Sequence, residues 1–253
     1  MEHPFFFEPR LPEGGDLFPL GEESARHVIT VLRMRNGDRL FLTDGRGALM
    51  EVEITAVEKK KAYVQPLDPS SANHQPPTDN RQLPTVNPQP STAPPLVLAV
   101  SLLKNSSRFE WILEKATEIG VSAIIPLVCE RTERIAFRQD RLQQIVISAM
   151  LQSQQVWLPE LMEPTPFKKF AGQTFAGRSY IAHCLREERH SLYSHPAGQP
   201  ARILIGPEGD FTPQEIRTAL NHGFIPVTLG NTRLRTETAA IVAVAALRNS
   251  IDT

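Results

Sequence analysis

Strand-like apolar runs alternate with helical patterns from residue 96 onward, and this alternation restricts the possible folds more than any other feature of the sequence. The runs expected to form buried strands are Leu96–Leu102, Val121–Val128, Ser179–Cys184, Arg202–Ile205 and Ile225–Leu229. Because a strand, its crossover helix and the next strand bring the chain back in the same direction, the alternation predicts an α/β domain with a parallel sheet. Ligands of such sheets bind beyond the carboxyl ends of the strands.

Local signals indicate where the helices begin and end. Ser107–Glu110 and Thr212–Glu215 both have the pattern of a capping box, and Gly120 and Gly223 are expected to close the two helices that follow. A further helix is expected over Asp140–Gln154. The first helix is predicted to bury apolar side chains at helical spacing, namely Phe109, Ile112, Leu113, Ala116 and Ile119.

The last helical segment is unusual because small apolar residues occupy almost all of Thr238–Leu247. A helix that is apolar on every side must be buried, and a closed dimer is the commonest way to cover it. Arg233, Arg235 and Glu237 come just before this segment, so two guanidinium groups and a carboxylate stand at the entrance of a buried element.

Two glycine-containing loops follow predicted strands. Ile205 leads into Gly206–Phe211, and Leu229 leads into Gly230–Arg233. Glycine lets the backbone approach a ligand closely. The carboxylates of Glu208 and Asp210 would repel a phosphate, and neither of the common phosphate-binding glycine motifs is present. The first loop is therefore better suited to a ligand that is uncharged or cationic.

Composition changes sharply between Pro66 and Pro95, a stretch with nine prolines and few large apolar side chains. Such a segment cannot bury enough apolar surface to offset the entropy of ordering it. The sequence therefore predicts a linker over residues 69–95 that divides residues 1–68 from residues 96–253.

The N-terminal part has the alternating pattern of a small β-barrel. Strands are expected at Arg39–Asp44, Ala48–Ala56 and Ala62–Leu67, with turn residues between them. A helix over Glu22–Leu32 is predicted to bury His27, Val28, Val31 and Leu32. Small barrels of this kind often bind RNA. Within residues 26–46 the arginines outnumber the acidic residues Asp38 and Asp44, which indicates either phosphate contacts or a solvated face. These arginines are Arg26, Arg33, Arg35, Arg39 and Arg46.

Composition further restricts the partners, metal sites and cellular location to be expected. The formal net charge of −1 provides no general argument for a nucleic-acid partner. Cys129 and Cys184 are too far apart for a metal-binding knuckle and too few for a disulfide framework, so neither a metal nor an oxidising compartment is expected. The N-terminus lacks the apolar core of a signal peptide, and no stretch approaches the about 18 apolar residues of a membrane span. A cytoplasmic location is expected.

The motifs together resemble one family. Two C-terminal segments carry the resemblance, LIGPEGDFTPQEI and LGNTRLRTETAAIVAVAAL. Three further segments are also similar: HVITVLRMRNGDRLFLTDGRG, WILEKATEIGV and ISAMLQSQQVWLPEL. The sequence resembles the RsmE family of the SPOUT superfamily, the small-subunit rRNA uridine-N3 methyltransferases. The resemblance implies an N-terminal PUA-like β-barrel and a C-terminal SPOUT domain with a deep trefoil knot. It also implies S-adenosylmethionine as methyl donor, a homodimer, and a uridine of 16S rRNA in the small ribosomal subunit as acceptor.

The resemblance also implies site residues. The donor is expected to bind Gly206, Pro207, Glu208, Gly209, Leu229, Gly230, Leu234, Arg235, Thr238 and Ala239. Uridine N3 carries a proton, and its loss places negative charge on the flanking carbonyl oxygens, which a guanidinium can stabilise. We expect Arg235 to have this catalytic role, with Arg233 as the second candidate and Glu237 as a residue that orients an arginine or favours the helix N-terminus. Arg26, Arg33 and Arg35 are expected to contact RNA.

Two other functions remain open from the sequence. A protein of this fold could be a non-catalytic RNA-binding assembly factor, which intact donor-binding loops argue against. It could also be a SPOUT methyltransferase acting on a tRNA ribose, although the barrel and the GPEG loop favour an rRNA base. No general base is identifiable, since lone histidines such as His27 and His183 are usually structural.

Overall fold

A computed structural model describes residues 3–12, 14–67, 94–133, 137–185, 188–196 and 198–251. The chain forms two compact units. The first contains Met1–Gln89 and Met150–Leu158, and the second contains Pro90–Ala149 and Pro159–Thr253. The predicted linker, residues 69–95, lies outside the described residues except for its last two positions.

The first unit is built on a five-stranded sheet. Its strand order is β1 (Phe5–Phe7), β3 (Arg39–Thr43), β4 (Leu49–Val57), β5 (Ala62–Pro66) and β2 (Phe18–Pro19). β1 runs parallel to β3, and the other neighbours are antiparallel. The three predicted strands are confirmed as β3, β4 and β5. β1 and β2 were not predicted, because strands of three and two residues are too short to show an alternating pattern.

The helix of this unit differs from the prediction. α1 (Glu22–Arg26) continues directly into η1 (His27–Val31), a π-helix in which the Leu32 amide donates to the His27 carbonyl at 3.0 Å. Of the four predicted core residues only Val28 is buried, and the other three are exposed. The predicted face was therefore wrong. The wider π turn rotates Val31 and Leu32 away from the face expected at 3.6 residues per turn.

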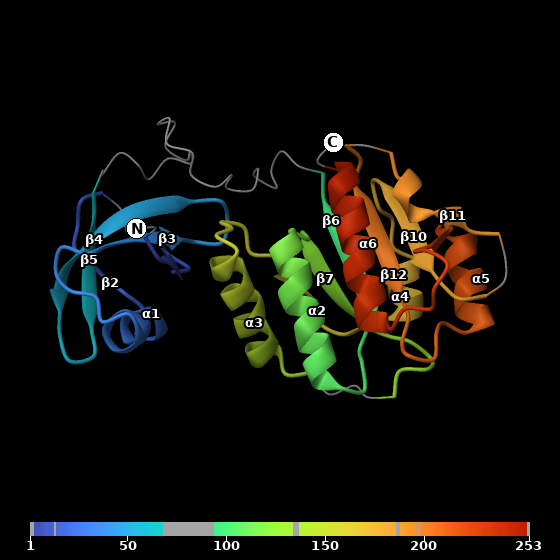
Figure 1. Cartoon of the computed structure of the whole chain (residues 1–253), viewed down its shortest axis with the longest axis horizontal. Helices are drawn as coiled ribbons and strands as arrows, with labels where there is room; N and C mark the ends of the chain where they lie inside the picture. The colour runs from blue at the N-terminus through green and yellow to red at the C-terminus, as the bar shows by residue number, and fades with distance from the viewer. Residues whose placement is uncertain are drawn as a thin grey trace. The chain divides into compact units, whose positions relative to one another are not determined.

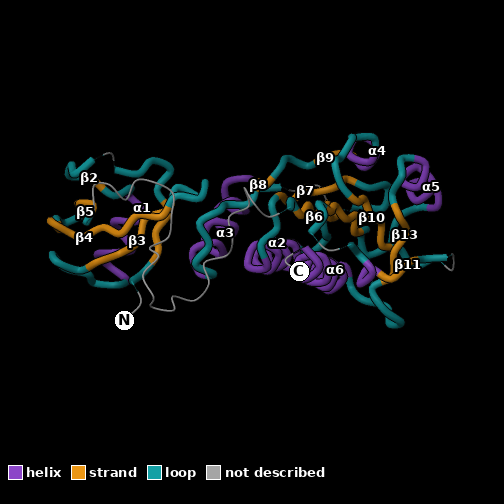
Figure 2. The backbone as a smooth tube through the Cα atoms, turned by 90° about the horizontal axis from the view of Figure 1, so that it is seen from above, coloured by secondary structure: helices purple, strands orange, loops and turns teal. Residues whose placement is uncertain are grey.

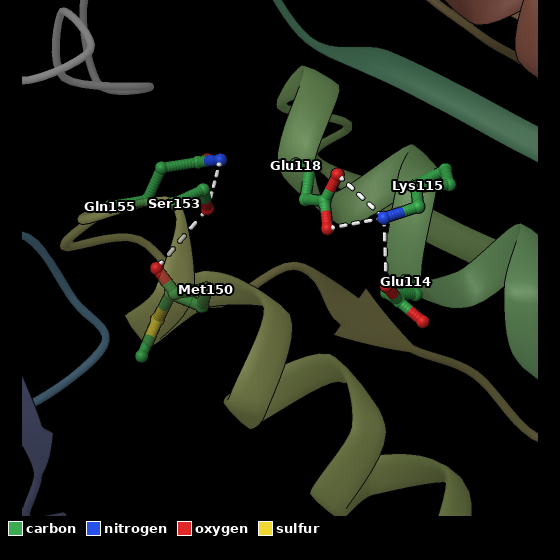
Figure 3. A network of polar contacts seen from close by, with 6 residues as sticks. All are labelled: Glu114, Lys115, Glu118, Met150, Ser153 and Gln155. Atoms are coloured by element: carbon green, nitrogen blue, oxygen red, sulfur yellow. Dashed lines mark hydrogen bonds and ion pairs between the residues drawn. The ribbon is translucent and has the colours of Figure 1, made fainter.

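The segment after α3 (Gln139–Gln152) belongs to the first unit. Gln154 adopts a left-handed conformation with φ 55°, which ends the helix. Figure 3 shows the polar contacts of this turn: the Ser153 hydroxyl donates to the Met150 carbonyl at 3.2 Å, and the Gln155 amide donates to the Ser153 hydroxyl at 2.9 Å. The chain thereby turns out of the helix into an extended strand-like segment.

This segment pairs with the turn between β3 and β4. The Gly47 amide donates to the Val156 carbonyl at 2.9 Å, and the Leu158 amide donates to the Gly45 carbonyl at 2.8 Å. A Cβ on Gly47 would overlap the indole ring of Trp157, and Gly47 has φ 101°. Glycine is therefore required here both by the backbone conformation and by the close packing of the tryptophan.

The second unit contains a parallel sheet, as predicted from the alternating pattern. Its order is β11 (His190–Ser191), β13 (Ile225–Thr228), β10 (Arg178–Ala182), β12 (Ala201–Ile205), β6 (Leu96–Ser101), β7 (Ala123–Val128) and β8 (Glu160–Leu161), while β9 (Thr165–Pro166) also pairs with β7. All of these pairs are parallel.

Helices cover both faces of this sheet. α2 (Ser106–Ile119) and α6 (Thr236–Ile251) lie side by side on one face, and α4 (Phe167–Ala171) and α5 (Pro213–Asn221) lie on the other (Figures 1 and 2). The short helix η2 (Leu192–Ser194) contacts α6. Ala99, Leu127 and Leu204 point into the core beneath α4 and α5. Because strand residues alternate between faces, their neighbours Leu98 and Ile203 are buried on the side of α2 and α6.

The helix ends test the capping predictions. The capping box at Thr212 and Glu215 is confirmed, since each side chain accepts a hydrogen bond from the backbone amide of the other residue. The one at Ser107 was wrong, because α2 begins at Ser106 and the Asn105 side chain caps it by accepting from the Ser107 amide at 2.9 Å. Gly120 closes α2 with φ 94°, as predicted. Among the described helices, none has the length and apolar character needed to cross a membrane.

Candidate active site

A cavity of about 340 Å³ lies at the carboxyl ends of three neighbouring strands, β10, β12 and β13. The residues that follow each strand form its walls, together with the start of α6 and one residue of α2. Its volume falls within the range of small-molecule sites, about 300–1,000 Å³. The sequence predicted a ligand site at this edge of the sheet, and the structure has a cavity there.

Most of the predicted donor-binding residues line this cavity. They are Gly206, Pro207, Glu208, Leu229, Gly230, Leu234, Arg235 and Ala239. Gly209 and Thr238 are not among the lining residues. The carbonyl of Gly209 instead accepts a hydrogen bond from Nη1 of Arg131 at 2.6 Å, so Gly209 contributes to holding the loop in place.

The loop after β12 is tightly constrained. A Cβ on Gly206 would lie 3.1 Å from the backbone nitrogen of Phe211, whose side chain is fully buried. Asp210 has φ 64°, and its two carboxylate oxygens accept from the amides of Cys184 and Phe211, each at 2.8 Å. These bonds join the loop after β12 to the loop after β10. The backbone around the cavity is therefore held in place by the protein itself.

The predicted catalytic residues occupy two different positions. Arg233 and Arg235 are exposed and line the cavity, and within the described residues neither guanidinium forms an ion pair. Glu237 lies in the first turn of α6 and is not a lining residue. Its partner is Arg108 of α2, with 3.5 Å between Arg108 Nε and Glu237 Oε1.

Several lining residues were not predicted. Ala182 ends β10, and His183 and Cys184 follow it; the rule that ligands bind at carboxyl ends of parallel strands could have included them. Arg108 and Arg189 also line the cavity, and Nη1 of Arg189 donates to the His183 carbonyl at 2.6 Å. No local motif points to these two arginines, because only the packing of distant segments brings them to the site.

Among the described residues, the thiol of Cys129 is unreactive and no metal-binding cluster is present. Cys129 is buried, and its burial raises the pKa of the thiol to about 12, so it stays protonated and unreactive. In the part of the chain that the structure describes, no three His, Cys, Asp or Glu side chains come together in a way that could hold a metal ion.

The predicted RNA-binding arginines lie close together in the first unit. Arg26 ends α1, and Arg33 and Arg35 follow η1; all three are exposed. Arg33 has φ 53°, and the amide of Arg35 donates to Asp38 Oδ2 at 2.7 Å. The local backbone thus presents three guanidinium groups to solvent around a short, constrained turn.

Comparison with known proteins identifies the family. A model described as "RNA methyltransferase domain" matches residues 90–248, and one described as "RNA methyltransferase PUA domain" matches residues 20–67. The ribosomal RNA small subunit methyltransferase E of Synechocystis sp. is 32% identical over 222 residues, which cover 85% of this chain and 67% of that protein. The chain belongs to the RsmE family. This confirms the resemblance found in the sequence.

Other RsmE proteins match over nearly their whole length. The Bacillus subtilis protein of the same name is 26% identical, covering 93% of this chain and 91% of its own. A crystal structure of ribosomal RNA small subunit methyltransferase E from Neisseria gonorrhoeae bound to S-adenosyl methionine is 31% identical. It superposes with a TM-score of 0.82 and covers 98% of each chain. The RsmE family thus accounts for both units of this protein.

Proposed function

We propose that this protein transfers the methyl group of S-adenosylmethionine to N3 of a uridine in the 16S rRNA of the small ribosomal subunit, in the cytoplasm. The observation that carries the proposal is the cavity at β10, β12 and β13. Its glycine loops offer backbone groups to the donor. Arg233 and Arg235, which have no ion-pair partner among the described residues, offer charge to the acceptor. The RsmE relative crystallised with S-adenosyl methionine supports this assignment.

The residues of the cavity suit this donor. S-adenosylmethionine supplies an electrophilic methyl group on a positively charged sulfur. Glu208 and Asp210 line the cavity, so the negative charge of its wall suits a cation and disfavours a phosphate. A Cβ on Gly206 would press against the backbone nitrogen of Phe211 at 3.1 Å, so glycine suits this part of the wall and leaves its backbone open to the ligand. The loops therefore have the charge and the shape that the donor requires.

The acceptor chemistry assigns a role to the arginines. N3 of uridine attacks the methyl carbon in line with the carbon–sulfur bond, whose electron pair stays on sulfur. The proton of N3 must leave for this attack, and the resulting charge spreads over the two uracil carbonyl oxygens. The guanidinium of Arg235 stabilises that charge, and Arg233 provides a second cation at the same wall. Holding donor and acceptor together supplies much of the remaining rate enhancement.

Mass spectrometry of nucleosides tests the function directly. Small subunits isolated from cells without this protein should gain 3-methyluridine when incubated with the protein and S-adenosylmethionine. The same incubation with Arg235→Ala should leave the subunits nearly unmodified. Appearance of a 2′-O-methylated nucleoside in tRNA would indicate a different acceptor. Subunits that stay unmodified with the wild-type protein, despite bound donor, would favour a non-catalytic assembly factor.

RNA binding is assigned to the PUA-like unit, residues 1–68, which the linker over residues 69–95 joins to the methyltransferase domain, residues 96–253. Replacement of Arg26, Arg33 and Arg35 with alanine should weaken binding to small subunits and reduce its salt dependence, because each phosphate contact releases counterions. Donor affinity, measured by calorimetry, should stay unchanged. If the triple variant keeps the wild-type salt slope, these arginines form only a solvated face.

We propose that the catalytic domain forms a deep trefoil knot and that the protein is a homodimer. α6 starts at the cavity, and near its end the Ser250 carbonyl accepts from Gly198, in the connection between β10 and β12, at 3.2 Å. This path past the connection supports the knot.

Three residues support a dimer because they remain exposed in the single chain: Thr238 and Ala245 on α6, and Trp111 on the neighbouring α2. Sedimentation at equilibrium measures the mass, and a monomer would contradict the second proposal.

A further inference from the structure

An ion pair joins the wall of the cavity to a carboxylate behind it. Arg108 lies in the first turn of α2, and Glu237 lies in the first turn of α6. Their side chains approach to 3.5 Å between Nε and Oε1. Arg108 is a lining residue of the cavity and has a side-chain exposure of 38%, whereas Glu237 is not a lining residue and has an exposure of 13%. The arginine thus stands between the carboxylate and the cavity.

Glu237 depends on Arg108 for its counter-charge. Its second oxygen, Oε2, is buried and has no hydrogen-bond partner within the described residues. In that part of the chain its carboxylate forms an ion pair with Arg108 alone. Because a mostly buried charge is costly unless it is paired, Glu237 favours a position of the Arg108 guanidinium beside it.

The rest of the Arg108 guanidinium is available to a ligand. A guanidinium carries five N–H donors in a planar fork, and Nε faces Glu237. Within the ranges that the structure describes, Nη1 and Nη2 donate no hydrogen bond to another residue. A fork held by a carboxylate at one edge is organised to bind an anion in a bidentate manner.

The chemistry of the reaction indicates which anion. The reacting part of the donor is a cation, which a guanidinium would repel. Arg233 and Arg235 are better placed to stabilise the negative charge that forms on uracil. The Arg108–Glu237 pair has zero net charge, so it stabilises a delocalised anion less than a free cation does. A phosphate of the RNA strand carries its charge before and after the reaction, and the directed N–H groups of Arg108 suit it.

We propose that Arg108 binds a phosphate next to the target uridine and that Glu237 is the positioning residue that holds Arg108 for this contact. The inference rests on the proposed function and assigns to this pair the recognition of the substrate strand. The contact exists equally in the ground state and the transition state. Loss of the contact therefore raises KM for the small subunit and leaves kcat nearly unchanged.

The test is a set of single and double variants assayed on small subunits that lack the modification. Arg108→Ala should raise KM about tenfold, with kcat within about twofold, and should lower the salt slope of binding by about one unit. Arg108→Lys keeps the charge but not the fork, so it should keep the salt slope and raise KM by less. Glu237→Gln should raise KM when Arg108 is present and have no effect in the Arg108→Ala background.

A matched ion pair of the same helix provides the control. Glu110 of α2 pairs with Arg141 of α3 at 2.9 Å, and neither residue lines the cavity. Arg141→Ala and Glu110→Gln should leave KM and the salt slope unchanged. Thermal unfolding of every variant shows whether it is folded.

Three results would overturn the inference. A loss of S-adenosylmethionine affinity in Arg108→Ala, measured by calorimetry, would place Arg108 against the donor. A lower melting temperature with unchanged KM would make the pair purely structural. Additive effects of Arg108→Ala and Glu237→Gln would remove the positioning role. The proposed function is judged separately, because it fails only if the wild-type protein does not methylate the subunit.

Discussion

Gly230→Val abolishes donor binding, with a loss of affinity of at least about 100-fold, or about 3 kcal/mol. Gly230 lines the cavity in the loop after β13 and has φ 129°, a conformation that L side chains rarely adopt. A Cβ at this position meets no protein atom within 4 Å, so a valine side chain would project into space that the protein leaves open beside the cavity. The branched side chain both strains the loop and competes with the ligand for the backbone.

Gly223→Val is the matched control for this result. Gly223 also has a positive φ, 79°, and a Cβ there would also meet no protein atom within 4 Å, but it follows α5 and does not line the cavity. Its substitution imposes a comparable backbone strain without reaching the donor. Calorimetry should show wild-type affinity for Gly223→Val and none for Gly230→Val, with unchanged circular dichroism in both. Equal affinity of the two variants would remove the loop after β13 from the site.

Arg235→Ala lowers kcat by about 10²–10³, because it removes the cation that stabilises the uracil oxygens as N3 loses its proton. Arg235 lines the cavity, is exposed, and has no ion-pair partner among the described residues, so its guanidinium is available to the substrate. Donor affinity should change little, since the loops contact the donor mainly through backbone groups. Single-turnover methylation of small subunits measures the effect on the chemical step.

The pH dependence distinguishes this role from a structural one. Raising the pH supplies more of the uridine anion that Arg235 no longer stabilises, so the activity of Arg235→Ala should recover partly in alkaline solution relative to the wild type. Arg217→Ala is the control: Arg217 is an exposed residue of α5 that binds Gln214 at 3.0 Å and lies outside the cavity lining. It should retain full kcat. A loss in Arg235→Ala that pH does not relieve, accompanied by a lower melting temperature, would contradict a catalytic role.

Periodic and short-range signals determined much of this fold. The apolar runs predicted the five central strands of the second unit and their parallel arrangement, because buried strands flanked by helical patterns have few alternative packings. Thr212 and Glu215 predicted their own helix start, since a capping box involves residues three positions apart. The glycine loops after β12 and β13 were located for the same reason, as they directly follow recognisable strands.

Other features of the fold and of the candidate site are visible only in the tertiary structure. Three features have no signature in the local sequence: the π-helix at His27–Val31, the pairing of the Gly45–Gly47 turn with Val156–Leu158, and the ion pair of Arg108 with Glu237. The last two depend on neighbours that chain folding brings close. Hydrophobic periodicity specifies neither which polar or glycine residues will meet nor where a helix widens into a π turn. The sequence alone thus determined the architecture and the glycine loops of the candidate site. Only the tertiary structure placed Arg108 in its wall and Glu237 behind it, because that contact exists only once α2 and α6 pack side by side on the sheet.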